Sequence, residues 1–186
     1  MRPVKREELL DPKTYERARA EIRPGVIEAK RVRRVHVGGV LNFLFENTAT
    51  VRYQIQEMIR AEGIAREPEI RHELDTYNEL LGRKGELGVT LLIEIPDPKE
   101  RDVRLREWLG LPGHLYLKLA SGEKVRPTFD PRQVGDDRLS SVQYLRFDVR
   151  GEVPVAAGTD LPALGAETPL DAEQREALRA DVSGDA

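Results

Sequence analysis

Carboxylates and amides gather in residues 43–62, whose sequence FLFENTATVRYQIQEMIRAE predicts an aromatic strand followed by an amphipathic helix. At 100° per residue, Gln54 and Glu57 lie along the border of the helix's apolar stripe, where a side chain can be half buried. Glu62 falls near the centre of that stripe, and a buried carboxylate is costly unless it is paired. The alternative is that Glu62 sits at a frayed helix end and reaches solvent or an arginine.

A second polar group is expected on one face of a sheet. Because successive side chains of a strand alternate between faces, Glu46 and Glu94 would share a face with Tyr116, Lys118, Tyr144 and Arg146. Two carboxylates beside tyrosines and bases could perform acid–base chemistry or hold a divalent cation. The alternative is a solvated sheet face crossed by ion pairs.

Several common kinds of site are excluded or disfavoured by the residues present. The chain has no cysteine, which excludes disulfides, Cys-ligated zinc, a Cys nucleophile and a Cys-bound iron–sulfur cluster. The Glu69–His72 step has the Glu-x-x-His spacing of di-iron bundles, but those sites need two copies and a four-helix core. No metal site is therefore predicted, and the sequence names no cofactor.

Charge and hydropathy indicate where the protein works. The formal net charge is −3, so no global basic character points to nucleic acid. The basic run at residues 30–34 is the one local hint of nucleic-acid binding, and it is more typical of the charged side of an edge strand. The charged N-terminus lacks the apolar run of a signal peptide, and no segment approaches the roughly 20 apolar residues that span a bilayer. We expect a cytoplasmic protein without membrane partners.

The elements that must position these side chains follow from periodicity and turn signals. Asn47 or Thr48 is expected to cap the helix that ends at Gly63, and Gly38-Gly39 is expected to turn a hairpin. In chain order, the sequence predicts one or two short helices within 5–29 that end before Pro24-Gly25, a hairpin of 31–37 with 40–47, helices at 48–62 and 69–81, a strand at 88–95, a short helix at 98–109, a hairpin of 114–120 with 125–130, a last clear strand at 142–149, and a helix from a capping box at 168–171 to about 180.

Together these elements predict an α+β protein with a mostly antiparallel twisted sheet of about five or six strands and helices packed on one face. One parity of the strands is apolar throughout, which suits packing under helices. Residues 1–150 are expected to form a single α+β domain. Residues 151–186 are expected to be a Gly/Ala/Pro-rich C-terminal extension whose short terminal helix packs on that domain and whose tail, VSGDA, frays.

The stretches RVRRVHVGG, FLFENTATVRYQIQEMIRAE, ELDTYNEL, TLLIEIPD and VQYLRF resemble the bacterial domain-of-unknown-function family numbered 3501, over roughly residues 5–180. The resemblance implies no assigned activity. Members are similar in being encoded beside rubrerythrin-like and iron–sulfur oxidoreductase-like proteins, which implies by association a role near peroxide defence or electron transfer. The family's polar motif falls here on Glu46, Asn47, Gln54, Gln56, Glu57, Glu62, Glu73, Tyr77 and Asn78.

One step of the family pattern is altered. A Gly-x-Asp-His-Pro step of the family is similar to Gly158–Pro162 here, with Leu161 where the family has His, which weakens any proposal of a His ligand there. The function expected is that of a non-enzymatic accessory or interaction protein that serves a redox, iron–sulfur or rubrerythrin-type partner. The alternative is a carboxylate-based metal-binding protein or an acid–base enzyme that uses the Glu/Gln/Tyr cluster. Enzymatic activity stays open.

Overall fold

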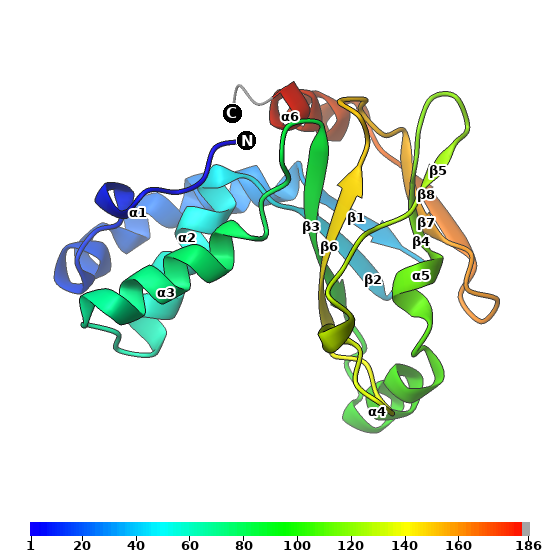
Figure 1. Ribbon diagram of the computed structural model, residues 1–186, viewed down its shortest axis with the longest axis horizontal. Helices are drawn as coiled ribbons and strands as arrows, with labels where there is room; N and C mark the ends of the chain where they lie inside the picture. Colours follow the sequence, from blue (N-terminus) through cyan, green and yellow to red (C-terminus); the bar gives the residue numbers. More distant parts are fainter. Residues whose placement is uncertain (184–186) are drawn as a thin grey trace.

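Two four-stranded antiparallel sheets stand beside a layer of helices in the computed structural model, which describes residues 1–183 (Figure 1). The elements in chain order are η1 (Arg6–Glu8), α1 (Pro12–Arg31), β1 (Arg34–Val37), β2 (Leu41–Phe45), α2 (Thr48–Ala61), α3 (Glu67–Asn78), β3 (Glu86–Ile93), α4 (Pro98–Glu107), α5 (Leu111–His114), β4 (Leu115–Lys118), β5 (Lys124–Val125), η2 (Pro131–Gln133), β6 (Val142–Asp148), β7 (Ala156–Thr159), β8 (Ala166–Pro169) and α6 (Ala172–Ser183). None of the helices in this described part has the length and apolar character needed to cross a bilayer.

The first sheet has the strand order β1-β2-β3-β6, and the second has the order β5-β4-β7-β8. The β1–β2 hairpin closes at Gly38 and Gly39, whose φ angles of 60° and 76° lie in the left-handed region that glycine adopts without strain. Strand β6 is an edge strand of the first sheet, and this edge becomes one wall of the groove described below.

Apolar side chains of both sheets share one core cluster, so the two sheets pack together. This cluster contains the predicted apolar parity of every long strand, including Phe43, Phe45, Leu91, Leu117 and Phe147. Helices α4, α5 and α6 close its ends with Leu105, Trp108, Leu111 and Leu178.

A second apolar cluster holds helices α2 and α3 together, beside the first sheet (Figure 1). Its members are the apolar stripes of the two helices and the N-terminal segment: Val4, Leu9, Val51, Ile55, Ile59, Ile64, Ile70, Leu74 and Leu81. Asn47 caps α2 and Gly63, with φ 64°, follows its end, as predicted.

The α+β class and the antiparallel pairing are confirmed, but the number and grouping of strands differ from the prediction. Eight strands form two sheets in place of one sheet of five or six. The prediction of 142–149 as the last strand is wrong, because β7 and β8 follow it. Strand β7 has the sequence AAGT and is buried along its whole length, so it lacks the alternation by which half-buried strands are recognised.

Two predicted helix ends are also wrong. Helix α1 runs through Pro24 and Gly25 to Arg31. Proline removes one backbone donor from a helix, but Ala20, which loses that bond, is exposed to water, and α1 packs along α2. Helix α6 begins after Asp171 and not at Thr168, because Asp171 and Gln174 exchange two hydrogen bonds of 2.8 Å while Thr168 belongs to β8. Of the predicted frayed tail, Val182 and Ser183 belong to α6, and the remainder lies outside the described residues.

Candidate functional site

Glu57, a carboxylate of the predicted cluster, accepts hydrogen bonds from an arginine and a tyrosine. Arg19 of α1 donates two hydrogen bonds to it, at 2.8 and 2.9 Å, and the Tyr15 hydroxyl donates a third at 2.7 Å. The Arg19 hydrogen bond is the largest cause that lowers the pKa of Glu57 to about 2. A carboxylate held this way stays ionised at neutral pH and joins α1 to α2.

Glu57→Gln is expected to lower the free energy of unfolding by about 1–2 kcal/mol at pH 7, a figure discounted for partial exposure. Because the folded pKa lies below the unfolded value near 4.5, this contribution is present above that value and is lost as the pH falls towards 2. Urea unfolding at pH 7 and at pH 3 measures this contribution. The difference in the free energy of unfolding between wild type and variant should be smaller at pH 3. Glu62→Gln, at the exposed end of the same helix, is the control and should change little; an equal effect of both variants would contradict the assignment.

The predicted amides serve as backbone clamps. The Gln56 side chain accepts from Leu10 N at 2.6 Å and donates to Leu10 O at 3.2 Å. Asn78 does the same to Val4, at 2.8 and 3.0 Å. Asn47 accepts from Thr50 N at 3.0 Å as the cap of α2. These residues hold the N-terminal segment and a helix start.

Glu46 is buried at the start of α2, with 6% of its surface exposed. It accepts from the Thr50 hydroxyl at 2.5 Å and from the Thr90 hydroxyl at 2.7 Å. Lys30 of α1 lies near enough for its charge to interact with Glu46, and burial is the main cause that lowers the pKa of Lys30. The two hydroxyls therefore solvate Glu46 in place of water.

The other members of the first cluster lie elsewhere. Glu62 is exposed at the C-cap of α2, so it does not enter the core as its position on the stripe had indicated. Glu62 and Glu73 line a shallow hollow beside Pro68. Gln54 lies near Tyr77, whose pKa is raised mainly by burial. The first candidate cluster thus does not converge on a single point.

The second candidate group is divided between the two sheets, so the prediction of one shared face is wrong. Tyr116 and Lys118 lie on β4 in the second sheet, where both donate to Glu167 at 2.9 Å. Burial, followed by this hydrogen bond, raises the pKa of Tyr116 to about 12. Glu94 accepts from Asn42 at 3.0 Å on the first sheet. Parity places residues on a face of a strand, but it does not say which sheet the strand joins.

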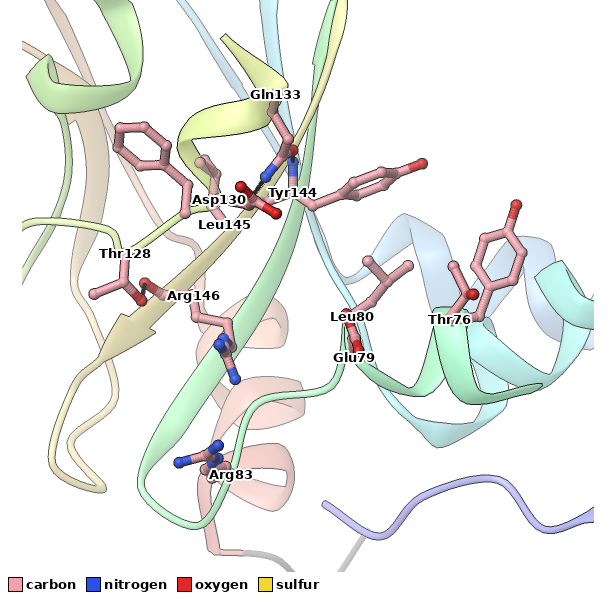
Figure 2. A pocket seen from close by; sticks show the side chains of 12 residues that line it. Thr76, Glu79, Leu80, Arg83, Thr128, Asp130, Gln133, Tyr144, Leu145 and Arg146 are labelled. Atoms are coloured by element: carbon pink, nitrogen blue, oxygen red, sulfur yellow. Dashed lines mark hydrogen bonds between the residues drawn. The ribbon is translucent and has the colours of Figure 1, made fainter. Parts of the chain in front are cut away.

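Three predicted residues from the two groups do meet in a groove of about 580 Å³ between α3 and β6. Tyr77 comes from the first group, and Tyr144 and Arg146 come from the second. Arg83, in the loop between α3 and β3, completes one end of the groove, and Figure 2 shows its side chain and that of Arg146 pointing into the same space. We call this the α3–β6 groove.

Two glycines bring the 79–85 loop onto the sheet. A Cβ on Gly88 of β3 would lie 1.8 Å from the Leu80 carbonyl oxygen, and one on Gly82 would lie 2.5 Å from the Glu86 oxygen. Only glycine permits such close backbone approach. Gly88 is also the cross-strand partner of Arg146, so the loop that carries Arg83 is pinned directly beside it.

The opposite wall of the groove is built on the edge of β6. The Gln133 side chain accepts from Tyr144 N at 2.6 Å and donates to Tyr144 O at 3.1 Å, in the place of a neighbouring strand. Thr128 and Arg146 exchange two backbone hydrogen bonds of 2.7 and 2.9 Å. The edge is therefore covered, and β6 presents the side chains of Tyr144 and Arg146 to the groove (Figure 2).

Arg83 and Arg146 differ from most arginines of this chain. Most of the others form ion pairs with carboxylates, such as Arg19 with Glu57 and Arg126 with Asp160. Within residues 1–183, the guanidinium groups of Arg83 and Arg146 form no hydrogen bond and no ion pair, although the Arg83 backbone N–H donates to the Glu86 carboxylate at 3.0 Å. Sequence reasoning missed Arg83, Thr128 and Gln133. Arg83 and Thr128 lie in loops and Gln133 lies in the single turn η2, and periodicity does not reveal the course of such segments.

The described residues do not bring together a set of side chains that could bind a metal ion. Across the described residues 1–183, no three His, Asp or Glu side chains come together as they would around a metal ion. His114, the histidine closest to a carboxylate, bonds Asp160 at 3.0 Å, and Arg126 also pairs with Asp160. Asp160 lies in the Gly158–Pro162 step, so this step forms an ion-pair network here.

The fold and groove define an α+β protein in which a helical layer flanks two packed sheets. The chain matches the model of a family described as protein of unknown function (DUF3501) over residues 3–182, and it belongs to this family. A crystal structure of a novel protein of unknown function from Burkholderia pseudomallei K96243 is similar, with a TM-score of 0.89 and 28% identity over 97% of this chain and 100% of that one. No curated protein matches.

Proposed function

We propose that this protein is a non-enzymatic accessory protein that binds a partner in the α3–β6 groove. The proposal rests on the difference between polar side chains that hold the fold together and polar side chains that line the groove. Glu57, Gln56 and Asn78 are engaged in holding helices and the N-terminal segment together. The side chains of two tyrosines and two arginines in the groove have no carboxylate partner among the described residues, which suits recognition better than acid–base chemistry.

The class of partner comes from the family. The neighbourhood of family members implies a redox, iron–sulfur or rubrerythrin-type oxidative-stress protein as the partner, and we place the pair in the bacterial cytoplasm. Without cysteine, the chain cannot itself hold a Cys-bound cluster, so the partner would supply the redox centre. Aromatic residues and arginine are the side chains that interfaces favour, and the groove presents both.

Affinity capture of the full chain from a native lysate under gentle conditions tests this proposal. We expect a redox or iron–sulfur protein to be enriched, and its purified form to bind the chain directly. Tyr144→Ala should reduce the recovery, because Tyr144 is 40% exposed along the groove and its hydroxyl forms no hydrogen bond with any of residues 1–183. Recovery of no redox protein, or equal recovery by the wild type and Tyr144→Ala, would count against the proposal.

A further inference from the structure

The charges that face the α3–β6 groove are few and unevenly neutralised. Two guanidinium groups, those of Arg83 and Arg146, point into one end, and neither is paired with a carboxylate in the part of the chain that the structure describes (Figure 2). Two carboxylates, Glu79 and Asp130, also line the groove. Asp130 is already paired, because Arg132 donates to it at 2.5 and 2.8 Å. Beside the arginine end, the Glu86 carboxylate accepts from the Arg83 backbone N–H at 3.0 Å. Two guanidinium groups thus face one nearby carboxylate, and an excess of positive charge remains at this end.

Geometry and charge together favour a carboxylate as the counterion. A guanidinium presents its donors as a planar fork that matches a carboxylate or phosphate, and two forks beside one space can hold one anion from two sides. Two like charges that face the same space repel, and an anion between them removes that repulsion. Glu79 would oppose a ligand of high negative charge such as a nucleic acid, so a ligand with one or two charges fits best.

We infer that the Arg83–Arg146 pair is the carboxylate-binding subsite of the groove, and that its occupant is an acidic segment of the partner polypeptide. The inference rests on the proposed function and names the chemistry of the partner. A groove of 580 Å³ is far larger than one carboxylate group fills. The remainder is lined by Tyr77, Leu80, Phe129 and Tyr144, which offer apolar and phenolic contacts to the residues beside the acidic one.

Fluorescence polarisation with two labelled pools of short peptides tests this inference. One pool carries two fixed Glu residues in otherwise random sequence, and the matched pool carries Gln at the same places. We expect the Glu pool to bind the wild type more tightly, and Arg83→Gln/Arg146→Gln to weaken it about tenfold or more, since each tenfold is about 1.4 kcal/mol. Added salt should weaken the binding of the Glu pool, through screening.

Arg17→Gln/Arg23→Gln is the matched control, because it removes two exposed arginines of α1 and leaves the groove intact. Equal binding of the two pools, or equal weakening by both double variants, would overturn the subsite. If free succinate or phosphate displaced the labelled Glu pool as strongly as unlabelled peptides of the same pool, the occupant would not be a polypeptide. Capture of a redox partner by both the wild type and Arg83→Gln/Arg146→Gln would overturn the subsite while the proposed function stands; capture by neither would overturn the function.

Discussion

Asp181→Ala should lower the free energy of unfolding by about 3–5 kcal/mol, the usual cost of leaving a buried charge without its partner. Asp181 of α6 and Arg33, just before β1, form two hydrogen bonds at 2.7 and 3.1 Å. Their side chains are 0% and 10% exposed, respectively. Removal of the carboxylate leaves the Arg33 guanidinium inside the protein with one remaining acceptor, the Ala29 carbonyl at 3.1 Å.

Thermal unfolding checks this expectation, and the melting temperature should fall by about 10 °C for a chain of this size. Glu173→Ala is the matched control: Glu173 of the same helix pairs with Arg31, but these side chains are 65% and 55% exposed. An exposed pair contributes about 0–1 kcal/mol, so this variant should melt close to the wild type. Similar falls in melting temperature for the two variants would show that burial does not determine how much the Arg33–Asp181 pair stabilises the fold. Should Asp181→Ala fail to fold, Asp181→Asn keeps the shape and isolates the loss of charge.

Gly88→Ala should destabilise the protein by about 3 kcal/mol, because the new methyl group would lie 1.8 Å from the Leu80 carbonyl oxygen. The contact is with backbone, so relief requires the 79–85 loop to lift from β3. That displacement would also move Arg83 away from Arg146 and open the groove. Amide hydrogen exchange should therefore be faster in the loop, and urea unfolding should show the fall in the free energy of unfolding.

Gly25→Ala serves as the control for Gly88→Ala. Gly25 lies within α1 and a Cβ there would meet nothing within 4 Å. Replacement of a helical glycine by alanine stabilises a protein by about 0.5–1 kcal/mol. The free energy of unfolding should therefore rise in Gly25→Ala and fall in Gly88→Ala. Unchanged stability of Gly88→Ala would contradict the packing described for the loop.

Local signals predicted the elements that have clear starts and ends. Asn47 before α2, Gly63 after it and the Gly38-Gly39 turn each have a physical role that is visible in sequence. Strand β7 had no such signal, since four small buried residues show neither alternation nor large apolar side chains. Pro24 gave a false stop, because packing of α1 on α2 outweighs the loss of one hydrogen bond.

The candidate site was predictable in its residues more than in its arrangement. Tyr77, Tyr144 and Arg146 were all selected, but in two separate groups, and the structure brings them to one groove. Glu57 and Gln56 were selected for chemistry and prove to hold the helices and the N-terminal segment. Which of two roles a border residue takes depends on its partner in space, such as Arg19, and that partner lies 38 positions away in the chain.

Photo-crosslinking in the native cells would show whether this groove receives a partner. A benzoylphenylalanine placed at Tyr144 should form an adduct that contains a redox or iron–sulfur protein. The same group at Val103 of α4, which is 52% exposed and outside the groove, should form no such adduct. Adducts of equal yield at both positions, or none at Tyr144, would show that the groove is not where the partner binds.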